Sequence, residues 1–287
     1  MSSCLDTVRR KPVFGAAGGI MSPNLLSPSI RVRTLFLSDV HLGTLECQAD
    51  RLLRLLRSFH AERIFLVGDI IDFWSLRNSV HWPPSHSAVL KELIERARAG
   101  TRVIFIPGNH DELCRDFCGQ PFQGIEIERE FTHQLADGRR LLVLHGDEFD
   151  TAVQCGSMRN FLGSWLYDLL LRWGYRLNGL RRAFGLPHWS LVTWLKNRVS
   201  NVREHVERFE RAAVEGARRR GFEGVVCGHI HRPAMEQRDG LLYCNVGDWV
   251  EHCTAITEGL NGELRLWTEQ ESQAAANPET APLKRAA

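Results

Sequence analysis

The chain has 287 residues, of which 44% are hydrophobic and 24% are charged, and its formal net charge is +2. This composition is that of a soluble globular protein and excludes a disordered chain, a fibre or a small disulfide-stapled domain. The length allows one large domain or two modest ones with complete cores. A net charge of +2 gives no indication of a nucleic-acid partner.

The eight cysteines are scattered along the chain and lack the paired spacings of a zinc framework. This usage predicts a reduced intracellular protein. No apolar run approaches the ~20 residues needed to cross a bilayer. The basic residues near the N-terminus are followed by a stretch broken by Gly and Pro, unlike a secretory signal. We therefore expect a cytoplasmic protein.

Composition predicts a flexible leader over residues 1–30, a folded domain over 31–268 and a disordered tail over 269–287. Apolar stripes at helical spacing predict helices through Leu52–Phe59 and through Val89–Ala97, the second ending at Gly100. Short β-rich runs predict strands at 34–37, 64–67, 102–106, 141–144, 224–227, 241–246 and near 252–256. The early strands alternate with helices and should be parallel, whereas the later ones lack helices between them and should make the sheet mixed. An α/β sandwich fits this order best.

Five short polar motifs follow predicted strands. They are Ser38-Asp39-Val40-His41, Gly68-Asp69, Gly108-Asn109-His110-Asp111, His145-Gly146-Asp147 and Gly228-His229-Ile230-His231. Ligands bind at the carboxyl ends of strands in open α/β sheets. Asp, His and Asn without Cys suit hard or borderline divalent cations. Asp39 with His41 and His229 with His231 are pairs at i, i+2 spacing. On an extended chain this spacing points both side chains of a pair to the same side.

Each motif has a simpler explanation when taken alone. Asp39 could be a helix N-cap, Gly68-Asp69 a common turn, Asn109 an Asx-turn residue, and the His-x-His pair two surface residues of a strand. Five such motifs in this order, each after an apolar strand, are very hard to explain by turns alone. The pattern favours a metal site over a set of loops.

The ordered set D-x-H, GD, GNH, HGD and GHxH resembles the calcineurin-like metallophosphoesterase family over residues 34 to 257. The resemblance implies a double β-sandwich flanked by helices and a centre of two divalent metal ions. Mn²⁺ is the first expectation, with Fe²⁺, Zn²⁺ and Mg²⁺ as alternatives. Carried over by residue, the first metal would be held by Asp39, His41 and His231, the second by Asn109, His145 and His229, with Asp69 bridging.

Two cations roughly 3.5–4 Å apart can clamp the oxygens of a phosphoryl displacement and generate hydroxide near neutral pH. The resemblance makes His110 the candidate for protonating the leaving oxygen, and Asp111 could orient its ring. Asp147 and Asp150 are candidates to support His145 or to reach substrate. Simple loop residues remain the alternative for these side chains.

A narrower resemblance concerns the UDP-2,3-diacylglucosamine pyrophosphatase group of lipid A synthesis, which releases UMP and a lipid 1-phosphate. Its marks are the GD motif running into Phe73-Trp74, the HGD motif, and a helical insertion over 159–220 before GHxHRP. Trp74 and Arg159 join Asp147 and Asp150 as candidate substrate-binding residues. An arginine follows the motif asparagine in that group, whereas this chain has His110, a difference that favours a separate branch with another substrate.

The insertion contains thirteen Lys or Arg against five Asp or Glu, interleaved with aromatic residues and leucines. Such a basic, amphipathic cap suits a nucleotide-linked lipid or the surface of an anionic membrane. The alternative is that this segment is a helical pair that packs on the core and leaves its arginines in solvent. No recognisable nucleic-acid-binding module accompanies the basic segment, so no nucleic-acid partner is expected. Rival functions are a phosphodiesterase or phosphatase on soluble nucleotides or phosphoproteins, and a metal-bound scaffold without turnover.

Overall fold

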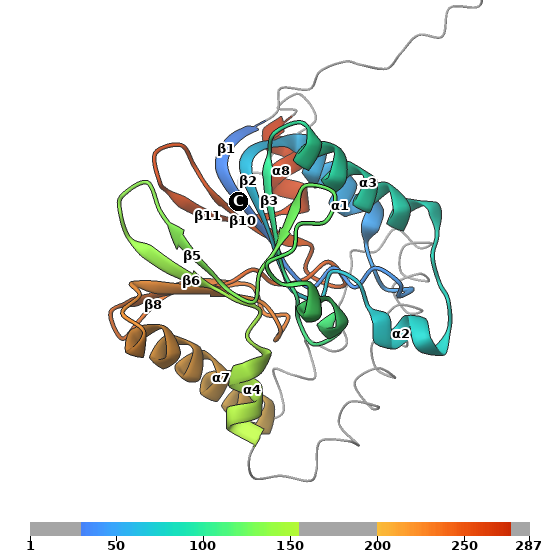
Figure 1. Ribbon diagram of the computed structural model, residues 1–287. Coiled ribbons are helices and arrows are strands. Elements are labelled where there is room, and N and C mark those ends of the chain that lie inside the picture. The colour runs from blue at the N-terminus through green and yellow to red at the C-terminus, as the bar shows by residue number, and fades with distance from the viewer. Residues whose placement is uncertain (1–29, 155–199, 277–287) are drawn as a thin grey trace, which may run out of the picture.

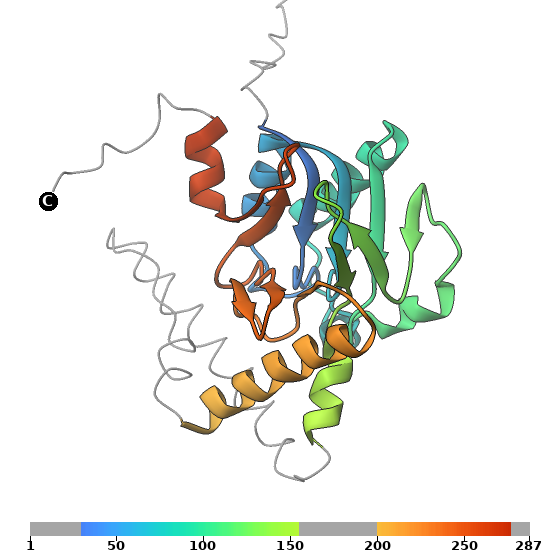
Figure 2. The same cartoon turned by 90° about the vertical axis from the view of Figure 1, so that its left-hand side faces the viewer.

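The computed structural model describes residues 30–154 and 200–276. Two β-sheets lie face to face, and helices cover the outer face of each sheet (Figures 1 and 2). The α/β sandwich predicted from the sequence is confirmed. Residues 1–29, residues 159–199 of the predicted cap with Arg159, and residues 277–287 of the predicted tail lie outside the described residues.

The larger sheet has six strands in the order β11-β10-β1-β2-β3-β4. Strands β1 to β4 pair in parallel, and β10 and β11 run antiparallel to their neighbours. The predicted parallel core is therefore confirmed. The strands are β1 (Ile30–Leu37), β2 (Phe59–Val67), β3 (Arg102–Ile106), β4 (Ile125–Ile127), β10 (Thr254–Glu258) and β11 (Leu264–Thr268).

The second sheet has five strands in the order β5-β6-β7-β9-β8. The three central strands are parallel, while β5 and β8 pair antiparallel to β6 and β9, so the sheet is mixed as predicted. The strands are β5 (Phe131–Gln134), β6 (Arg140–Val143), β7 (Gly224–Cys227), β8 (Ala234–Arg238) and β9 (Leu241–Asn245).

Apolar helix faces cover the outer side of each sheet. On the six-stranded sheet lie α1 (Ala49–Ser58), α3 (Pro84–Arg98) and α8 (Glu269–Ala276), and on the five-stranded sheet lie α4 (Asp147–Gln154) and α7 (Ser200–Arg219). Two short elements, α2 (Phe73–Asn78) and η1 (Glu112–Phe117), follow the ends of β2 and β3. The helix predicted through Phe59 ends at Ser58, because Phe59 is the first residue of β2.

The prediction of a disordered tail from residue 269 was wrong for Glu269–Ala276, which forms α8. The Glu269 carboxylate is buried and accepts hydrogen bonds from Arg51 and Arg54 of α1 at 3.2 and 2.9 Å. Ser272 is also buried. The Ala- and Glu-rich composition that suggested disorder also has high helix propensity, and contacts with α1 fix the helix.

The core between the sheets is apolar and well filled. Phe36, Phe65 and Ile104 from the larger sheet meet Val143 and Val226 from the smaller one, and all five are fully buried. This packing fixes the two sheets against each other and therefore the relative positions of the loops at their ends. Within 30–154 and 200–276, no helix has the length and apolarity required to span a membrane.

Candidate metal centre

The five polar motifs meet at one edge of the sandwich. Asp39, Asp69 and Asn109 follow the parallel strands β1, β2 and β3, and His145 and His229 follow the parallel strands β6 and β7. The carboxyl ends of parallel strands share one edge of a sheet, so the fold brings side chains from distant parts of the chain together. The described structure places all seven predicted ligands at this edge.

Asp39, His41 and His231 form a first group, with one potential ligand atom from each within 4.8 Å of the others. His231 Nε2 lies 3.2 Å from Asp39 Oδ1 and 3.3 Å from His41 Nε2. Asp39 Oδ1 is buried and has no hydrogen-bond partner among residues 30–154 and 200–276. A buried carboxylate oxygen without a hydrogen bond, facing ring nitrogens, is the arrangement that a cation would complete.

Asp69, His145 and His229 form a second group under the same 4.8 Å limit. His145 Nε2 lies 3.3 Å both from Asp69 Oδ2 and from the side-chain oxygen of Asn109. His145 Nδ1 lies 3.0 Å from the carbonyl oxygen of Val67 and donates to it when it carries the proton. In that tautomer Nε2 has a free lone pair directed at the carboxylate and the amide oxygen.

The donor set fits two divalent cations of the borderline or hard class. It offers imidazole nitrogens, carboxylates and one amide oxygen, and no thiol. The four imidazoles and two carboxylates of the two groups have side chains at most 16% exposed. Burying this many titratable groups in one place is costly unless they hold a counter-charge.

Backbone strain also marks these positions. Five of the residues have positive φ angles, between 50° and 69°, which non-glycine residues rarely adopt: Asp39, His41, Asp69, His229 and His231. Each such conformation costs on the order of 1 kcal/mol or more and persists only where surrounding structure imposes it. The alternative that Asp39 caps a helix is wrong, because the next helix, α1, begins only at Ala49.

Charge interactions within the site are strong. Although burial opposes ionisation, contact with His231 lowers the pKa of Asp39, and the charge of His145 holds the pKa of Asp69 well below its usual value. Burial likewise disfavours the imidazolium of His41 and His145, yet the nearby carboxylates raise their pKa values to about 9 and about 10. Asp69 contributes to both of these shifts, so it lies close to both groups.

A model of the family described as calcineurin-like phosphoesterase matches residues 32–233. The chain belongs to this family. It is therefore a phosphoester hydrolase, and the sequence-based prediction of fold, family and enzyme class is confirmed. The matched range contains all five motifs.

Relatives of the phosphoesterase share one name. A UDP-2,3-diacylglucosamine hydrolase of Neisseria gonorrhoeae (strain ATCC 700825 / FA 1090) is 27% identical over 235 residues, which cover 75% of this chain and 88% of that protein. A protein of the same name from Aeromonas salmonicida (strain A449) is 28% identical over 268 residues, covering 85% and 96%. The solved structure of Yfce, a phosphoesterase from E. coli, is 17% identical with a TM-score of 0.43, covering 83% and 94%.

Asp72 is a site residue of the phosphoesterase that the motifs did not predict. Its Oδ2 accepts from His41 Nδ1 at 3.0 Å and lies 2.9 Å from His110 Nδ1. Its other oxygen accepts from the backbone amide of Ser75 and so begins α2. Asp72, His41 and His110 also place one potential ligand atom each within 4.8 Å of the others. Because the Asp72 carboxylate contacts the Nδ1 atoms of both rings, however, it leaves both Nε2 atoms available to bind metal or substrate. The signal was an aspartate three residues after Asp69.

The predicted contact between Asp111 and the His110 ring is replaced by the contact from Asp72. Asp111 is fully buried and accepts hydrogen bonds from the backbone amides of Gly108, Asp69, Ile70 and Ile71 at 2.6 to 3.3 Å. The carboxylate thereby ties the loop after β3 to the loop after β2. Asp111 positions Asp69 and Asn109 rather than a catalytic ring.

The remaining predicted residues lie around the edge of the site. Asp147 forms an ion pair with Arg115 at 2.8 Å, and Asp150 lies 3.3 Å from His229 Nε2 and 3.0 Å from His205 of α7. The sequence indicated Asp150 as a candidate to support His145 or to reach substrate. In the structure Asp150 contacts His229 instead of His145. Trp74 is 42% exposed and its ring centroid lies 4.2 Å from that of His110.

Asp248 is a second residue that the sequence analysis missed. It is fully buried after β9, and its Oδ2 lies 2.5 Å from His252 Nδ1 and 3.9 Å from His231 Nδ1. Its Gly247-Asp248 sequence after a strand repeats the pattern of Gly68-Asp69. Applying that pattern to the final strands would have found it.

Proposed function

We propose that this phosphoesterase acts through two divalent cations held at the shared edge of its sheets. Asp39, His41 and His231 would hold one, Asn109, His145 and His229 the other, and Asp69 would be shared. The observation that carries the proposal is the pair of buried residue groups, in each of which the potential ligand atoms lie within 4.8 Å of one another. Asp69 raises the pKa of an imidazole in both groups, His41 in one and His145 in the other. Mn²⁺ is the proposed ion, with Fe²⁺, Zn²⁺ and Mg²⁺ as alternatives, because the site combines imidazoles, which suit iron and zinc, with carboxylate and amide oxygens, which suit manganese and magnesium.

When bound, two such cations neutralise charge on the phosphoryl oxygens and lower the pKa of water at the site. His110 supplies the proton for the leaving oxygen. Its Nδ1 lies 2.9 Å from the Asp72 carboxylate, which orients the ring and leaves Nε2 to donate. His110 is partly exposed, as a group that must meet substrate has to be.

The proposed substrate is UDP-2,3-diacylglucosamine or a related nucleotide-linked lipid, with cleavage of the pyrophosphate to give UMP and a lipid 1-phosphate. The shared name of relatives at 27% to 29% identity supports this substrate class. So does Trp74, an exposed aromatic ring whose centroid lies 4.2 Å from that of the proposed proton donor. The basic segment 159–220 would contact the anionic substrate or the inner face of an anionic membrane in the cytoplasm.

The direct test offers UDP-2,3-diacylglucosamine to manganese-loaded protein and detects UMP by mass spectrometry. UDP-glucose in parallel shows whether acyl chains are needed, and bis-p-nitrophenyl phosphate reports the general reaction. We expect UMP from the lipid at a higher rate than from UDP-glucose. Trp74→Ala should reduce turnover of the lipid more than turnover of the small diester, because it removes apolar surface beside the reacting group.

The rival functions give different results in the same experiment. Turnover of the small diester without UMP from the lipid would contradict the lipid assignment and favour a phosphodiesterase on soluble substrates. Two bound metal ions without turnover of any ester would favour a scaffold. The proposed role of His110, which stands where the lipid A group has an arginine, has its own test. His110→Asn should reduce turnover while leaving two metal ions bound.

A further inference from the structure

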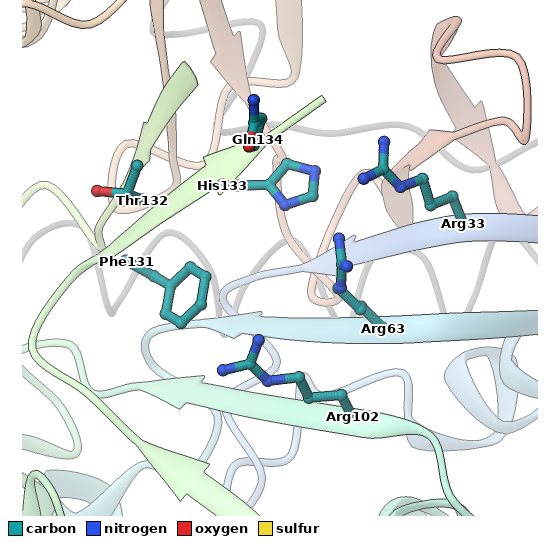
Figure 3. Close-up of a pocket in the computed structure, with 7 residues that line it drawn as sticks. All are labelled: Arg33, Arg63, Arg102, Phe131, Thr132, His133 and Gln134. Atoms are coloured by element: carbon teal, nitrogen blue, oxygen red, sulfur yellow. The ribbon is translucent and has the colours of Figure 1, made fainter. Parts of the chain in front are cut away.

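A cavity of about 210 Å³ opens between the two sheets, beside the middle of β1 and β2 and the first residue of β3 (Figure 3). Arg33, Arg63 and Arg102, one from each strand, lie on one side, and Phe131 and His133 of β5 lie on the other. Arg63 precedes Asp69 by six residues, which at about 3.3 Å per residue corresponds to roughly 20 Å of chain. The cavity is therefore separate from the candidate metal centre.

Two of the three arginines have carboxylate partners. Arg33 contacts the buried Glu258 at 2.9 Å, and Arg102 makes two hydrogen bonds with Glu126 at 2.7 and 2.8 Å. The Arg102 guanidinium also lies over the ring of Phe131, 5.1 Å from its centroid. These contacts hold the outer two guanidinium groups at the sides of the cavity.

Arg63 lies between them and is half-buried. Within residues 30–154 and 200–276, its guanidinium has no ion-pair or hydrogen-bond partner. Arg63 and Arg102 are direct register partners on neighbouring strands, and like charges in that arrangement are destabilising. Of the three guanidinium groups, that of Arg63 therefore borders the cavity without a carboxylate in direct contact among the described residues. An anion is the group missing from this arrangement.

We propose that the cavity binds a phosphate group, either free or as the monoester of a small metabolite. Guanidinium groups match the oxygens of phosphate with paired hydrogen bonds and keep their charge at any physiological pH. The oxygens of a phosphate can accept from Arg63 and from the flanking guanidinium groups at once, whereas a carboxylate offers only two oxygens. The volume is below the ~300 Å³ at which pockets for drug-sized ligands begin, so it suits a small anion.

The test measures thermal unfolding of manganese-loaded, desalted protein with 10 mM inorganic phosphate, glycerol phosphate, acetate or chloride at equal ionic strength. Phosphate bound at the metal centre affects all variants alike, so the comparison is between wild type, Arg63→Gln and the exposed control Arg57→Gln on α1. We expect phosphate to raise the Tm of wild type and Arg57→Gln by about 2–4 °C more than that of Arg63→Gln. Without phosphate, Arg63→Gln should be at least as stable as wild type, because a repelling charge is gone.

The ester identifies the source of the phosphate. A larger stabilisation by glycerol phosphate than by inorganic phosphate assigns the site to an organic monoester, and the reverse assigns it to the free ion. Equal phosphate effects in wild type and Arg63→Gln would overturn the proposal. So would an acetate effect as large as that of phosphate, or a loss of stability in Arg63→Gln without phosphate, which would make Arg63 a structural residue.

Discussion

Asp72 contacts two imidazoles at once, one a candidate ligand and the other the candidate proton donor. Burial raises its pKa, but the contacts with His110 and His41 outweigh this effect and lower the pKa far below its usual value. The carboxylate therefore stays charged across the physiological range. One side chain thus couples the orientation of the His41 ring to that of the His110 ring.

Replacing Asp72 with Asn should reduce turnover of bis-p-nitrophenyl phosphate by about 10- to 100-fold, the usual cost of losing a group that orients a metal ligand. The amide removes the negative charge that faces the Nδ1 atoms of His41 and His110. Asp116→Asn, on the exposed side of η1, is the matched control and should retain full activity. Turnover by the Asp72 variant within twofold of wild type would contradict the assigned role.

His41 and His145 predict how manganese binding depends on pH. Since their pKa values are raised to about 9 and about 10 without metal, both are protonated at pH 7, and a cation must displace those protons. Manganese affinity should rise between pH 6 and 8, by about tenfold per pH unit for each proton released. Titration calorimetry in buffers of different ionisation enthalpy counts the protons, and a pH-independent affinity would refute the assignment.

The same shifts predict the stability of the metal-free protein. A folded-state pKa above the unfolded value of 6.5 contributes stability that is complete below pH 6.5 and is lost as the pH rises toward 9 and 10. The metal-loaded protein should lack this loss, because its ligands are already neutral.

The ligand side chains were predictable from sequence because each follows an apolar strand within a short motif. Their supporting residues were less so. Asp72 lies 3.0 Å from His41 and 2.9 Å from His110, and Asp248 lies 3.9 Å from His231. These histidines are distant in the chain, and sequence does not show such contacts. Asp111 was placed beside the wrong partner for the same reason, since its neighbour in sequence is His110 and its neighbours in space are backbone amides.

At the scale of elements, the site depends on close approach between the loops after β1 and β7. A Cβ atom on Gly228 would lie 1.9 Å from Ser38 Oγ and 2.3 Å from Asp39 Oδ2. Gly228 has no positive φ, so the need for glycine here is space rather than backbone conformation.

Gly228→Ala should therefore separate the two loops and weaken manganese binding by about tenfold or more, with a stability loss of about 1–3 kcal/mol from overpacking. Titration calorimetry and thermal unfolding measure the two effects. Gly138→Ala is a useful comparison, because its Cβ would face open space. That variant should lose stability through its positive φ and keep its manganese affinity, and a similar loss of affinity in both would contradict the account.

The strands missed from sequence are β4, β5, β8 and β11, which are the four edge strands of the two sheets. Central strands such as β3 and β7 are buried on both faces and read as apolar runs. Edge strands are more exposed, as in β8, whose three middle residues are all exposed, so they lack an apolar run. Their pairing depends on neighbours that a one-dimensional pattern does not contain.

At the scale of the whole molecule, the two sheets bring residues from 39 to 231 to one edge and leave an arginine-lined cavity beside the middle of β1 and β2 and the first residue of β3. The net charge of +2 also hides an uneven distribution of charge along the chain, because the segment 159–220 carries an excess of eight positive charges. The family pattern predicted the sandwich and the metal edge. The cavity was not predictable, because it depends on three arginines that are neighbours only across strands.

The most direct test of the two-metal site counts manganese per chain by plasma mass spectrometry and measures diester turnover in wild type, Asp69→Ala and the exposed control Asp137→Ala. We expect two manganese ions in wild type and in the control. Asp69→Ala should hold at most one ion and show no measurable turnover, because the shared ligand is gone. Two ions and near-normal turnover in Asp69→Ala would contradict the central claim.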